Sequence, residues 1–380
     1  MGIELAEFEQ DDPGARGEAH GELWRPQIHE LCAIRRELLL RRGRLVSAER
    51  LDELAARHLP LLVAEAPALA DELAGIARGA GVTPTELVLL NHYTDLRELI
   101  GAAYEEAVPK DSLPRGDADS STAVYLPGAT KGPVLGQTWD THASARPYVR
   151  LLRIRPRSGG EEVLCFTLTG CLGLLGVAGS GLAIATNSLF TTDGQIGLVW
   201  PAVVRTLLAE GSAAAARARL ARLPLGGGRN VMLADGRDFF GIECSAQLQV
   251  LMQSGAGAAH LHTNHCFDPV LRRRERVPAS STSFRRMELA TTLYVQQRPR
   301  DAAGLRALLA SHEGHPRSLC SHVGEDRGDA GGDSAGSQTC GVMVMNLVGG
   351  EVLAGAGCAQ ANPPRQLGFT RWRGLEETIR

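Results

Sequence analysis

The sequence predicts an α+β fold in which helices pack outside stacked, mainly antiparallel sheets. Residues 20–108 repeat apolar side chains at helical spacing, as at Leu87, Leu90 and Tyr93. From Ser120 onward the pattern changes to short apolar runs separated by glycine and proline turns, which is typical of strands. Many short strands combined with long helical blocks fit layers of helix on sheet.

The chain divides near residue 119. Thr83-Pro84-Thr85-Glu86 is a capping box with proline at the first helical position, so it predicts a helix start inside the N-terminal block. Residues 109–119 are polar and contain proline and glycine, which predicts a linker. We therefore expect a helical N-terminal segment over 1–119 and a core over 120–380, packed together as one globular unit.

The apolar runs of the core predict its strands and helices in order. Strands are expected at 122–126, 133–139, 149–155, 162–168, 174–178, 182–187, 230–234, 239–244, 248–253, 258–262, 340–347 and 351–356. Helical stretches are expected at 199–222 and 283–310. The last two strands meet at Val348-Gly349-Gly350, which is a hairpin signal, and the Gly/Asp/Ser-rich residues 322–339 predict a loop.

Composition excludes several classes of function. A net charge of −3 gives no basic footprint for nucleic acid or for an anionic membrane surface. The most apolar segment, 171–185, is interrupted by glycines and cannot form a spanning helix. The acidic first residues predict no export signal, and the eight cysteines lack paired spacing, so we expect reduced thiols in a cytoplasmic protein.

Hydroxyl and carboxylate side chains mark the start of the core. Asp119-Ser120-Ser121-Thr122 opens one apolar strand, and Gln137-Thr138-Trp139-Asp140 ends the next one. This is the pattern of a nucleophile at a strand end beside a carboxylate that can orient it. The alternatives are that the Ser-Ser-Thr run caps a turn, that Asp140 is a solvated strand-end carboxylate, and that Trp139 packs in the core.

These segments resemble the acyl-coenzyme A:6-aminopenicillanic-acid acyltransferase family, the isopenicillin N acyltransferase-like enzymes among the N-terminal-nucleophile hydrolases. In that family Gly-Cys-Thr-Thr-Ala opens the strand and Gln-Asn-Trp-Asp follows. Here Ser120-Ser121-Thr122-Ala123 and Gln137-Thr138-Trp139-Asp140 stand at those places. Serine replaces the cysteine, Asp119 replaces the glycine before it, and Thr138 replaces an asparagine. The resemblance implies a four-layer αββα sandwich.

The resemblance also implies a mechanism. Autocatalytic cleavage at Asp119-Ser120 would free an α-amine, which titrates at about 7.7–8.0 in model peptides and can act as the general base for the Ser120 hydroxyl. Asp140 would hold the nucleophile in register. Residues 1–119 would then be a pro-segment or a separate α chain.

A second family-like segment is His262-Thr263-Asn264-His265. An asparagine in such a run is usually a turn former, but the family uses it as the oxyanion donor, and that role is carried to Asn264. The remaining residues of these family-like segments are expected near the site without an assigned step: Asp119, Ser121, Thr122, Trp139, Asn187, Thr263 and His265.

Metal and nucleotide sites are not predicted. His312, His315, Cys320 and His322 are ligand types, but their spacing matches no common zinc finger, and a similar segment occurs in the family without a metal. The glycine-rich runs at 179–181 and 226–228 precede no Lys-Ser/Thr pair, so neither is a phosphate loop. We expect no metal and no organic cofactor.

The predicted function is an amide hydrolase or acyltransferase acting through a Ser120 acyl-enzyme. Its substrate would be a small N-acyl or amino-acid-derived compound of secondary metabolism, with no nucleic-acid or membrane partner; formation of a homo-oligomer stays open. The alternative is an unprocessed relative that binds a ligand or partner without catalysis, because the cysteine and the glycine of the family are replaced.

Overall fold

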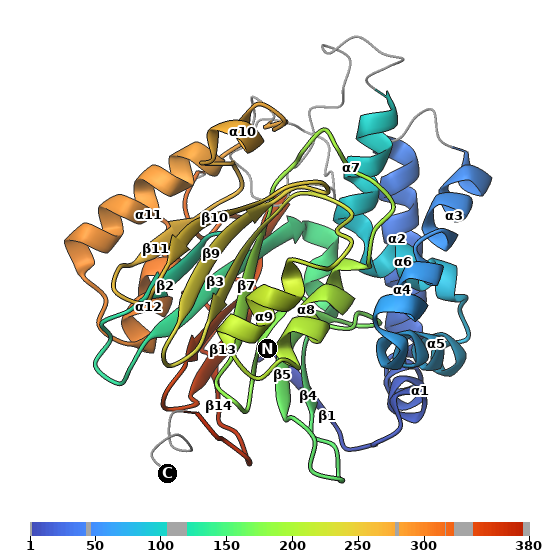
Figure 1. Ribbon diagram of the computed structural model, residues 1–380, viewed down its shortest axis with the longest axis horizontal. Coiled ribbons are helices and arrows are strands. Elements are labelled where there is room, and N and C mark those ends of the chain that lie inside the picture. Colours follow the sequence, from blue (N-terminus) through green and yellow to red (C-terminus); the bar gives the residue numbers. More distant parts are fainter. Residues whose placement is uncertain are drawn as a thin grey trace.

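Two sheets packed face to face form the centre of the protein in the computed structural model (Figure 1). The structure describes residues 2–42, 47–104, 120–277, 281–315, 317–322 and 337–374. Side chains from both sheets interlock between them. Tyr125 of one sheet stacks on Phe239 of the other at 4.1 Å between ring centroids, and Trp139 lies 5.8 Å from Phe166.

The larger sheet has eight strands in the order β1-β4-β5-β6-β7-β8-β9-β10. Their bounds are Glu4–Phe8, Val149–Ile154, Val163–Leu168, Leu175–Ala178, Ala183–Ser188, Arg229–Ala234, Phe239–Cys244 and Gln249–Ser254. The smaller sheet has the order β11-β2-β3-β12-β13-β14. Its strands are His260–His262, Ala123–Leu126, Val134–His142, Ser337–Asn346, Val352–Ala356 and Arg365–Leu367. Among the paired strands of the described chain, only β1 and β4 are parallel, so the prediction of mainly antiparallel sheets is confirmed.

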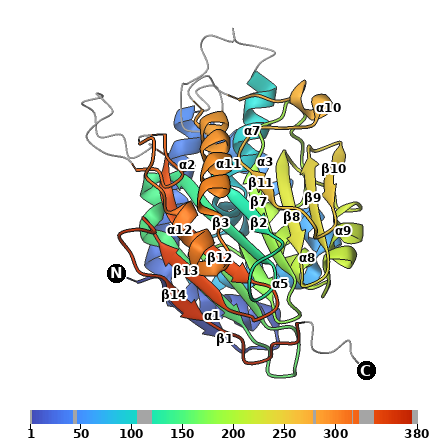
Figure 2. The same cartoon turned by 90° about the vertical axis from the view of Figure 1, so that its left-hand side faces the viewer.

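Helices cover both outer faces of the sheet pair, which completes the expected four layers. Helices α8 (Trp200–Leu208) and α9 (Ala213–Leu220) pack on the larger sheet. Helices α11 (Ser283–Gln297) and α12 (Ala302–Leu309) pack on the smaller one. In Figure 2, α11 and α12 lie on one side of the sheets and α8 and α9 on the other.

Each long helical stretch predicted for the core is two helices. Gly211 lies in the break between α8 and α9 with φ of 77°, a backbone conformation that favours glycine. Helix α11 ends at Arg298, whose backbone is in the left-handed region with φ of 44°. Because this position is not a glycine, the sequence did not predict the helix end there. The short helix α10 (Pro269–Arg272) and strands β1 and β14 were not predicted.

The N-terminal segment supplies seven helices and one strand among its described residues. The helices are α1 to α7, at Pro13–Leu23, Arg25–Arg42, Ala48–Ala56, Leu59–Glu65, Pro67–Ala80, Pro84–Asn91 and Tyr93–Tyr104. They stand together at one side of the sheets (Figure 1). The capping box is present, because the Thr83 hydroxyl accepts the Glu86 N–H and the Glu86 carboxylate accepts the Thr83 N–H. Strand β1 precedes the helices and extends the larger sheet beside β4.

Helices α1 and α5 touch backbone to backbone. A Cβ added at Gly17 would lie 2.0 Å from the Glu72 carbonyl oxygen, and one added at Gly75 would lie 2.1 Å from the Gly14 carbonyl oxygen. Only glycine permits this approach. At the same contact the buried Glu72 carboxylate pairs with Arg16 of α1 at 2.8 Å and with Arg205 of α8 at 3.0 Å.

Some predictions fall on residues that the structure does not describe. These are the linker at 109–119 and the greater part of the expected loop at 322–339.

Across the described residues, no helix combines the length and the apolar character needed to cross a membrane. All eight cysteines are described, and each is a buried free thiol.

Candidate active site

The serine pair lies where β2 begins, beside the end of β3. The Thr122 N–H donates to the Thr138 hydroxyl, and the Thr138 N–H donates to the Thr122 carbonyl, both at 3.0 Å. One step earlier the Ser120 N–H donates to the Asp140 carbonyl at 3.2 Å. The two polar segments singled out in the sequence are therefore neighbours on adjacent strands.

The two serine hydroxyls have different surroundings, because adjacent residues of an extended chain point to opposite sides. The Ser120 Oγ lies 3.4 Å from the Asp140 Oδ2 and 3.2 Å from the Ser337 Oγ of β12. Ser121 lines a cavity, and its Oγ accepts hydrogen bonds from the Asn187 Nδ2 at 2.7 Å and the Asn264 Nδ2 at 3.3 Å. Two carboxamide donors thus converge on Ser121.

Both faces of the Asn264 carboxamide are fixed. Its Oδ1 accepts the Ser121 N–H at 2.7 Å and the Arg286 Nη2 at 2.8 Å. Its Nδ2 must then point the other way, toward the Ser121 Oγ and the Ser188 carbonyl oxygen, which lies at 3.0 Å. The Asn264 N–H donates to the Ser283 Oγ at 2.7 Å, which holds the residue in the loop after β11.

Asn187 is oriented by its neighbour on the next strand. Asn187 of β7 and Asn230 of β8 face each other in the sheet register, and both are fully buried. The Asn230 Nδ2 donates to the Asn187 Oδ1 at 2.8 Å, which turns the Asn187 Nδ2 toward Ser121. Asn230 was not singled out in the sequence.

Arg286 is a further site residue that sequence reasoning missed. Its guanidinium is buried in α11, where Nη1 donates to the Ser121 carbonyl at 2.6 Å and to the Thr122 hydroxyl at 3.1 Å. Burial lowers the pKa of Arg286 to about 10, while Asp140 acts in the opposite direction. The available signal was its place on the apolar face of the helix with Leu289 and Leu293, because a charge at a core position needs partners.

Asp140 is a buried carboxyl with an unusual proton affinity. Burial raises its pKa to about 7, although the charge of Arg286 and hydrogen bonds from Thr339 and Ser120 act to lower it. Its Oδ1 has no hydrogen-bond partner within the described part of the chain. Because a group with this pKa exchanges its proton near neutral pH, Asp140 is suited to acid–base work beside the serine pair.

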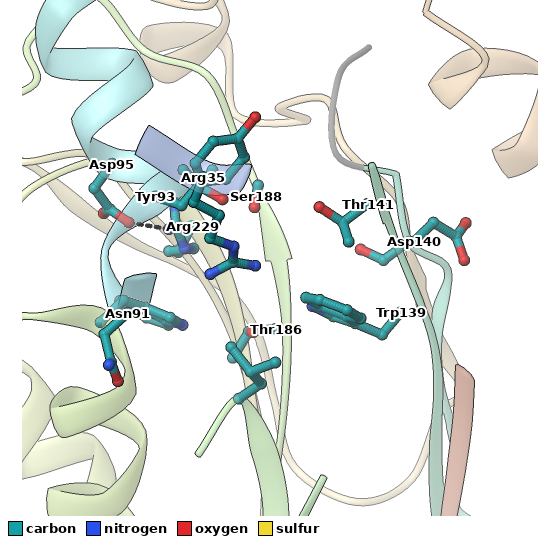
Figure 3. A pocket seen from close by; sticks show the side chains of 14 residues that line it. Arg35, Asn91, Tyr93, Asp95, Trp139, Asp140, Thr141, Thr186, Ser188 and Arg229 are labelled. Carbon is teal, nitrogen blue, oxygen red and sulfur yellow. Dashed lines mark hydrogen bonds and ion pairs between the residues drawn. The ribbon is translucent and has the colours of Figure 1, made fainter. Parts of the chain in front are cut away.

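The cavity beside Ser121 is built from three parts of the chain (Figure 3). Its empty space amounts to about 550 Å³ with the open mouth included. The core strands and α8 contribute Ser121, Trp139, Asp140, Thr141, Leu174, Thr186, Ser188, Trp200 and Arg229, and the N-terminal helices contribute Arg35, Asn91, Tyr93, Thr94 and Asp95. The contribution of the N-terminal helices was not predicted.

One wall of the cavity combines an ion pair with an aromatic side chain. Arg229 and Asp95 form a buried ion pair, drawn dashed in Figure 3, so the charge of this arginine is already neutralised. The guanidinium of Arg35 lies over the Tyr93 ring, 5.0 Å from its centroid. The Tyr93 hydroxyl is buried without a hydrogen-bond partner among the described residues.

Comparison with known proteins identifies the family. A family model described as acyl-coenzyme A:6-aminopenicillanic acid acyl-transferase matches residues 128–328, more than half of the chain. The chain belongs to this family. Family membership and the four observed layers agree with the N-terminal-nucleophile hydrolase fold that the resemblance implied.

Individual relatives are distant. The chain is 23% identical over 284 residues to the 40 kDa form of acyl-coenzyme A:6-aminopenicillanic-acid-acyltransferase from Emericella nidulans, covering 73% of this chain and 75% of the relative. Penicillin V acylase from Agrobacterium tumefaciens matches with a TM-score of 0.43 and 14% identity, over 66% of this chain and 86% of that one. A mutant of conjugated bile acid hydrolase from Clostridium perfringens gives a TM-score of 0.35 and 10% identity, over 68% and 99% of the two chains.

Within the acyltransferase family match lie Asp140, Asn187, Asn264 and Arg286, whereas the serine pair precedes it. Asp119, and with it the Asp119-Ser120 bond expected to break, lies outside the described residues. Trp139 packs on Phe166 and also lines the cavity, so it has both a core contact and a cavity contact.

A buried carboxylate holds the loop that carries Asn264. The Glu243 carboxylate of β9 accepts hydrogen bonds from the His262 ring at 2.9 Å and from the N–H groups of Phe267 and Asp268 at 2.6 and 2.9 Å. Burial alone would raise the pKa of Glu243, but these hydrogen bonds outweigh it and lower the pKa below its ordinary value. Glu243 therefore clamps both ends of the loop.

Thr263 and His265 lie on either side of Asn264 and contact the start of α11. The Thr263 hydroxyl donates to the Ser283 carbonyl at 3.1 Å, and the His265 Nδ1 lies 2.8 Å from the Ser283 hydroxyl. Burial lowers the pKa of His265 to about 4, so its ring is neutral at physiological pH. These contacts hold the segment that carries Asn264 against α11.

Proposed function

We propose that this protein is an N-terminal-nucleophile amide hydrolase or acyltransferase that forms a seryl acyl-enzyme with a small N-acyl compound. One observation carries the proposal. Two oriented carboxamide N–H groups, from Asn187 and Asn264, converge on the Ser121 hydroxyl at the wall of a cavity. Acyl transfer needs such donors, because the oxygen of the attacked carbonyl becomes negatively charged in the tetrahedral intermediate, next to the serine Oγ.

The geometry favours Ser121 as the nucleophile over Ser120, the residue that the sequence comparison favoured. Ser121 lines the cavity and contacts both carboxamides, whereas the Ser120 hydroxyl faces Asp140 and Ser337. Either serine of the pair can be matched to the single cysteine of the family, so the sequence match allows two alignments that differ by one residue. We therefore place the processing site at the Ser120-Ser121 bond.

Processing begins with attack by the Ser121 Oγ on the Ser120 carbonyl carbon. The hydroxyl proton passes to the Ser121 nitrogen as the C–N bond breaks, which leaves an ester between Ser120 and the Ser121 Oγ. Water then hydrolyses the ester to a Ser120 carboxylate and restores the Ser121 hydroxyl. The Asn264 Oδ1, already 2.7 Å from the Ser121 nitrogen, would hold the freed α-amine.

Turnover reuses the same atoms. The α-amine takes the proton of the Ser121 hydroxyl as the Oγ attacks the substrate amide carbonyl. The Asn187 and Asn264 Nδ2 groups stabilise the oxyanion, and one such donor is worth about 3–4 kcal/mol of barrier. The proton passes to the leaving amine, and the acyl ester is then transferred to water or to another amine. Asp140 positions the serine pair through Ser120.

The cavity supports a substrate with an apolar acyl group and a polar end. Trp139, Trp200 and Leu174 supply apolar surface, while Thr141, Thr186 and Ser188 bring polar side chains to the lining. The relative from Emericella nidulans is named for transfer to 6-aminopenicillanic acid. An N-acylated 6-aminopenicillanic acid is therefore the first compound to test.

The test compares purified wild-type protein with Ser121→Ala, Ser120→Ala and Ser121→Cys. We expect wild type to give two bands on a denaturing gel, with the larger fragment beginning at Ser121 by N-terminal sequencing. Ser121→Ala should remain one chain without amine release from the N-acyl substrate. Ser120→Ala should still be cut and active, because it removes only the contacts of the Ser120 hydroxyl with Asp140 and Ser337.

Two outcomes would contradict the proposal in different ways. A larger fragment beginning at Ser120 would return the nucleophile to that residue and leave the acyl-transfer function intact. If wild type and Ser121→Cys both stay intact and inactive through long incubation, the site is not poised for acyl transfer, since a thiol is the stronger nucleophile near neutral pH. The protein would then be a binding relative.

A further inference from the structure

A second cluster of reactive side chains lies away from the cavity. His312 and His322 come from the segment after α12, together with Cys320, and Cys358 comes from the turn after β13. One ligand atom from each of the four residues lies within 4.8 Å of the other three. The mechanism proposed above uses none of them.

Two sulfur–nitrogen separations within the cluster match those of ligands around one ion, whereas the two histidine nitrogens lie closer together than the roughly 3.3 Å expected of two nitrogen ligands of a tetrahedral ion. The Cys320 Sγ lies 3.6 Å from the His322 Nε2, the Cys358 Sγ lies 3.4 Å from the His312 Nε2, and the two Nε2 atoms are 2.8 Å apart. In tetrahedral zinc sites, bonds of about 2.3 Å to sulfur and about 2.0–2.1 Å to nitrogen place neighbouring S and N ligands about 3.5 Å apart. Two cysteines with two histidines is also a common structural zinc set.

The turn that carries Cys358 is held in place by other parts of the chain. The Ala361 N–H donates to the Cys358 Sγ at 3.4 Å, and the Asn362 side chain donates to the Cys358 carbonyl at 3.1 Å. Arg306 of α12 donates to the carbonyls of Ala359 and Asn362. The hydrogen bond from Ala361 orients the sulfur and stabilises the thiolate form that binds metal, and the others fix the backbone of the turn.

The other cysteine is fixed as well. The Cys320 N–H donates to the Ser311 carbonyl at 3.0 Å, and the Ser318 hydroxyl donates to the Cys320 carbonyl at 2.6 Å. Cys320 is fully buried, while His312 and His322 are half-buried and leave an approach from solvent. Both histidines face the sulfurs with Nε2, the nitrogen farther from the backbone.

We propose that His312, Cys320, His322 and Cys358 form a structural zinc site. With four protein ligands the coordination is complete, so the ion would have no open position for substrate. The expectation of no metal rested on a spacing that matches no common zinc finger and on a similar segment that occurs in the family without a metal. It considered His315 with the local ligands and did not include Cys358, which lies 46 residues from His312. Pairing of β12 with β13 and the turn after it bring the fourth ligand near.

The site would brace the strand beside the candidate active site. Directly before His322, Ser321 exchanges two hydrogen bonds with Thr339 of β12: its N–H donates to the Thr339 Oγ1, and its carbonyl accepts the Thr339 N–H, both at 2.9 Å. Thr339 faces Asp140 in the register of β12 and β3. A metal that ties the 312–322 segment to the β13 turn would therefore stabilise the position of Asp140.

Metal analysis of the full chain tests the proposal independently of catalysis. After exhaustive dialysis against metal-free buffer under reducing conditions, we expect about one zinc per chain by elemental mass spectrometry. Replacement of zinc by Co²⁺ should give the strong visible absorption of tetrahedral cobalt and a thiolate-to-cobalt charge-transfer band. Cys358→Ser and His312→Ala should each lower zinc content at least several-fold. His315→Ala is the matched control and should leave it unchanged.

Three results would overturn the proposal. The first is a reduced wild-type chain that holds less than about 0.1 zinc and shows no thiolate-to-cobalt band on Co²⁺ addition. The second is an equal loss of zinc in His315→Ala and His312→Ala. The third is a Cys320–Cys358 disulfide in peptides from freshly purified protein. The cobalt spectrum uses the unsubstituted chain, so the test holds even where a variant fails to fold.

Discussion

The Asp140 side chain lies beside the serine pair, and its ionisation there costs stability. Burial raises its pKa to about 7, above the ordinary value of 3.8, so the folded protein binds this proton more tightly than the unfolded chain does. The resulting stabilisation is fully present below the unfolded pKa and is lost as pH rises through about 7. The buried Asp140 carboxyl therefore loses its proton and becomes charged near neutral pH.

Asp140→Asn should remove this dependence. The amide keeps the shape of the carboxyl but cannot ionise. Between about pH 5 and about pH 8 the free energy of unfolding of wild type should fall relative to that of the variant by on the order of 2 kcal/mol. Urea unfolding of both proteins at the two pH values measures this difference. Parallel curves for the two proteins would show that Asp140 titrates normally in the folded state.

Asn230 should act on catalysis only through Asn187. Its amide fixes the direction of the Asn187 carboxamide and does not line the cavity. We expect Asn230→Ala to lower kcat by on the order of 10-fold with little change in KM, because an oxyanion donor acts in the transition state. Asn187→Ala should cost more, on the order of 100-fold.

A double-mutant cycle separates positioning from general damage to the fold. In an Asn187→Ala background, Asn230→Ala should have almost no further effect on kcat. Multiplicative losses in the double variant would instead mean that Asn230 influences the site by another route.

At the scale of single elements, the close contact between α1 and α5 depends on glycines, which have no side chain to separate the two backbones. Gly75→Ala would place its methyl group 2.1 Å from the Gly14 carbonyl oxygen, so the helices must separate. We expect a loss on the order of 3 kcal/mol in the free energy of unfolding, measured with urea. Gly128→Ala is the control, because an added Cβ there meets no atom within 4 Å. Equal stability of the two variants would show that α1 shifts freely on α5.

Strand positions were predictable because turn residues separate one strand from the next. The runs at 122–126 and 133–139, for example, became β2 and β3 to within a few residues, since Pro127, Gly128 and Gly132 separate them. Strand β1 escaped prediction because its five residues gain their partner only from β4, far along the chain. The end of α11 at Arg298 escaped because an arginine in the left-handed region carries no sequence signal.

The site was predictable only as far as local motifs reach. Asp140 and Asn264 were identified by short runs of residues that resemble a family, and both lie by the serine pair. Arg286 and Asn230 are single residues in ordinary helix and strand patterns, so only packing brings them to the site. The choice between Ser120 and Ser121 depends on which side of one strand faces the cavity, which a motif with two serines leaves undefined.

At the scale of the whole molecule, the N-terminal segment and the core contribute to the same cavity and to the same sheet. Arg35 and Tyr93 of the N-terminal helices line the same cavity as Trp139 and Ser121 of the core. The segment also closes one edge of the larger sheet through β1. A substrate in the cavity would therefore touch both sides of the proposed processing bond.

The parallel pairing of β1 with β4 has a consequence for the fate of a cut chain. Cleavage within the serine pair would leave two polypeptides that share a single β-sheet, with Glu72 of one bonded to Arg205 of the other. Neither piece could leave without exposing the interior of its companion. The cleaved protein would therefore be an obligate heterodimer of two fragments of one chain. The chain would have to fold before it is cleaved, because each fragment completes the structure of the other.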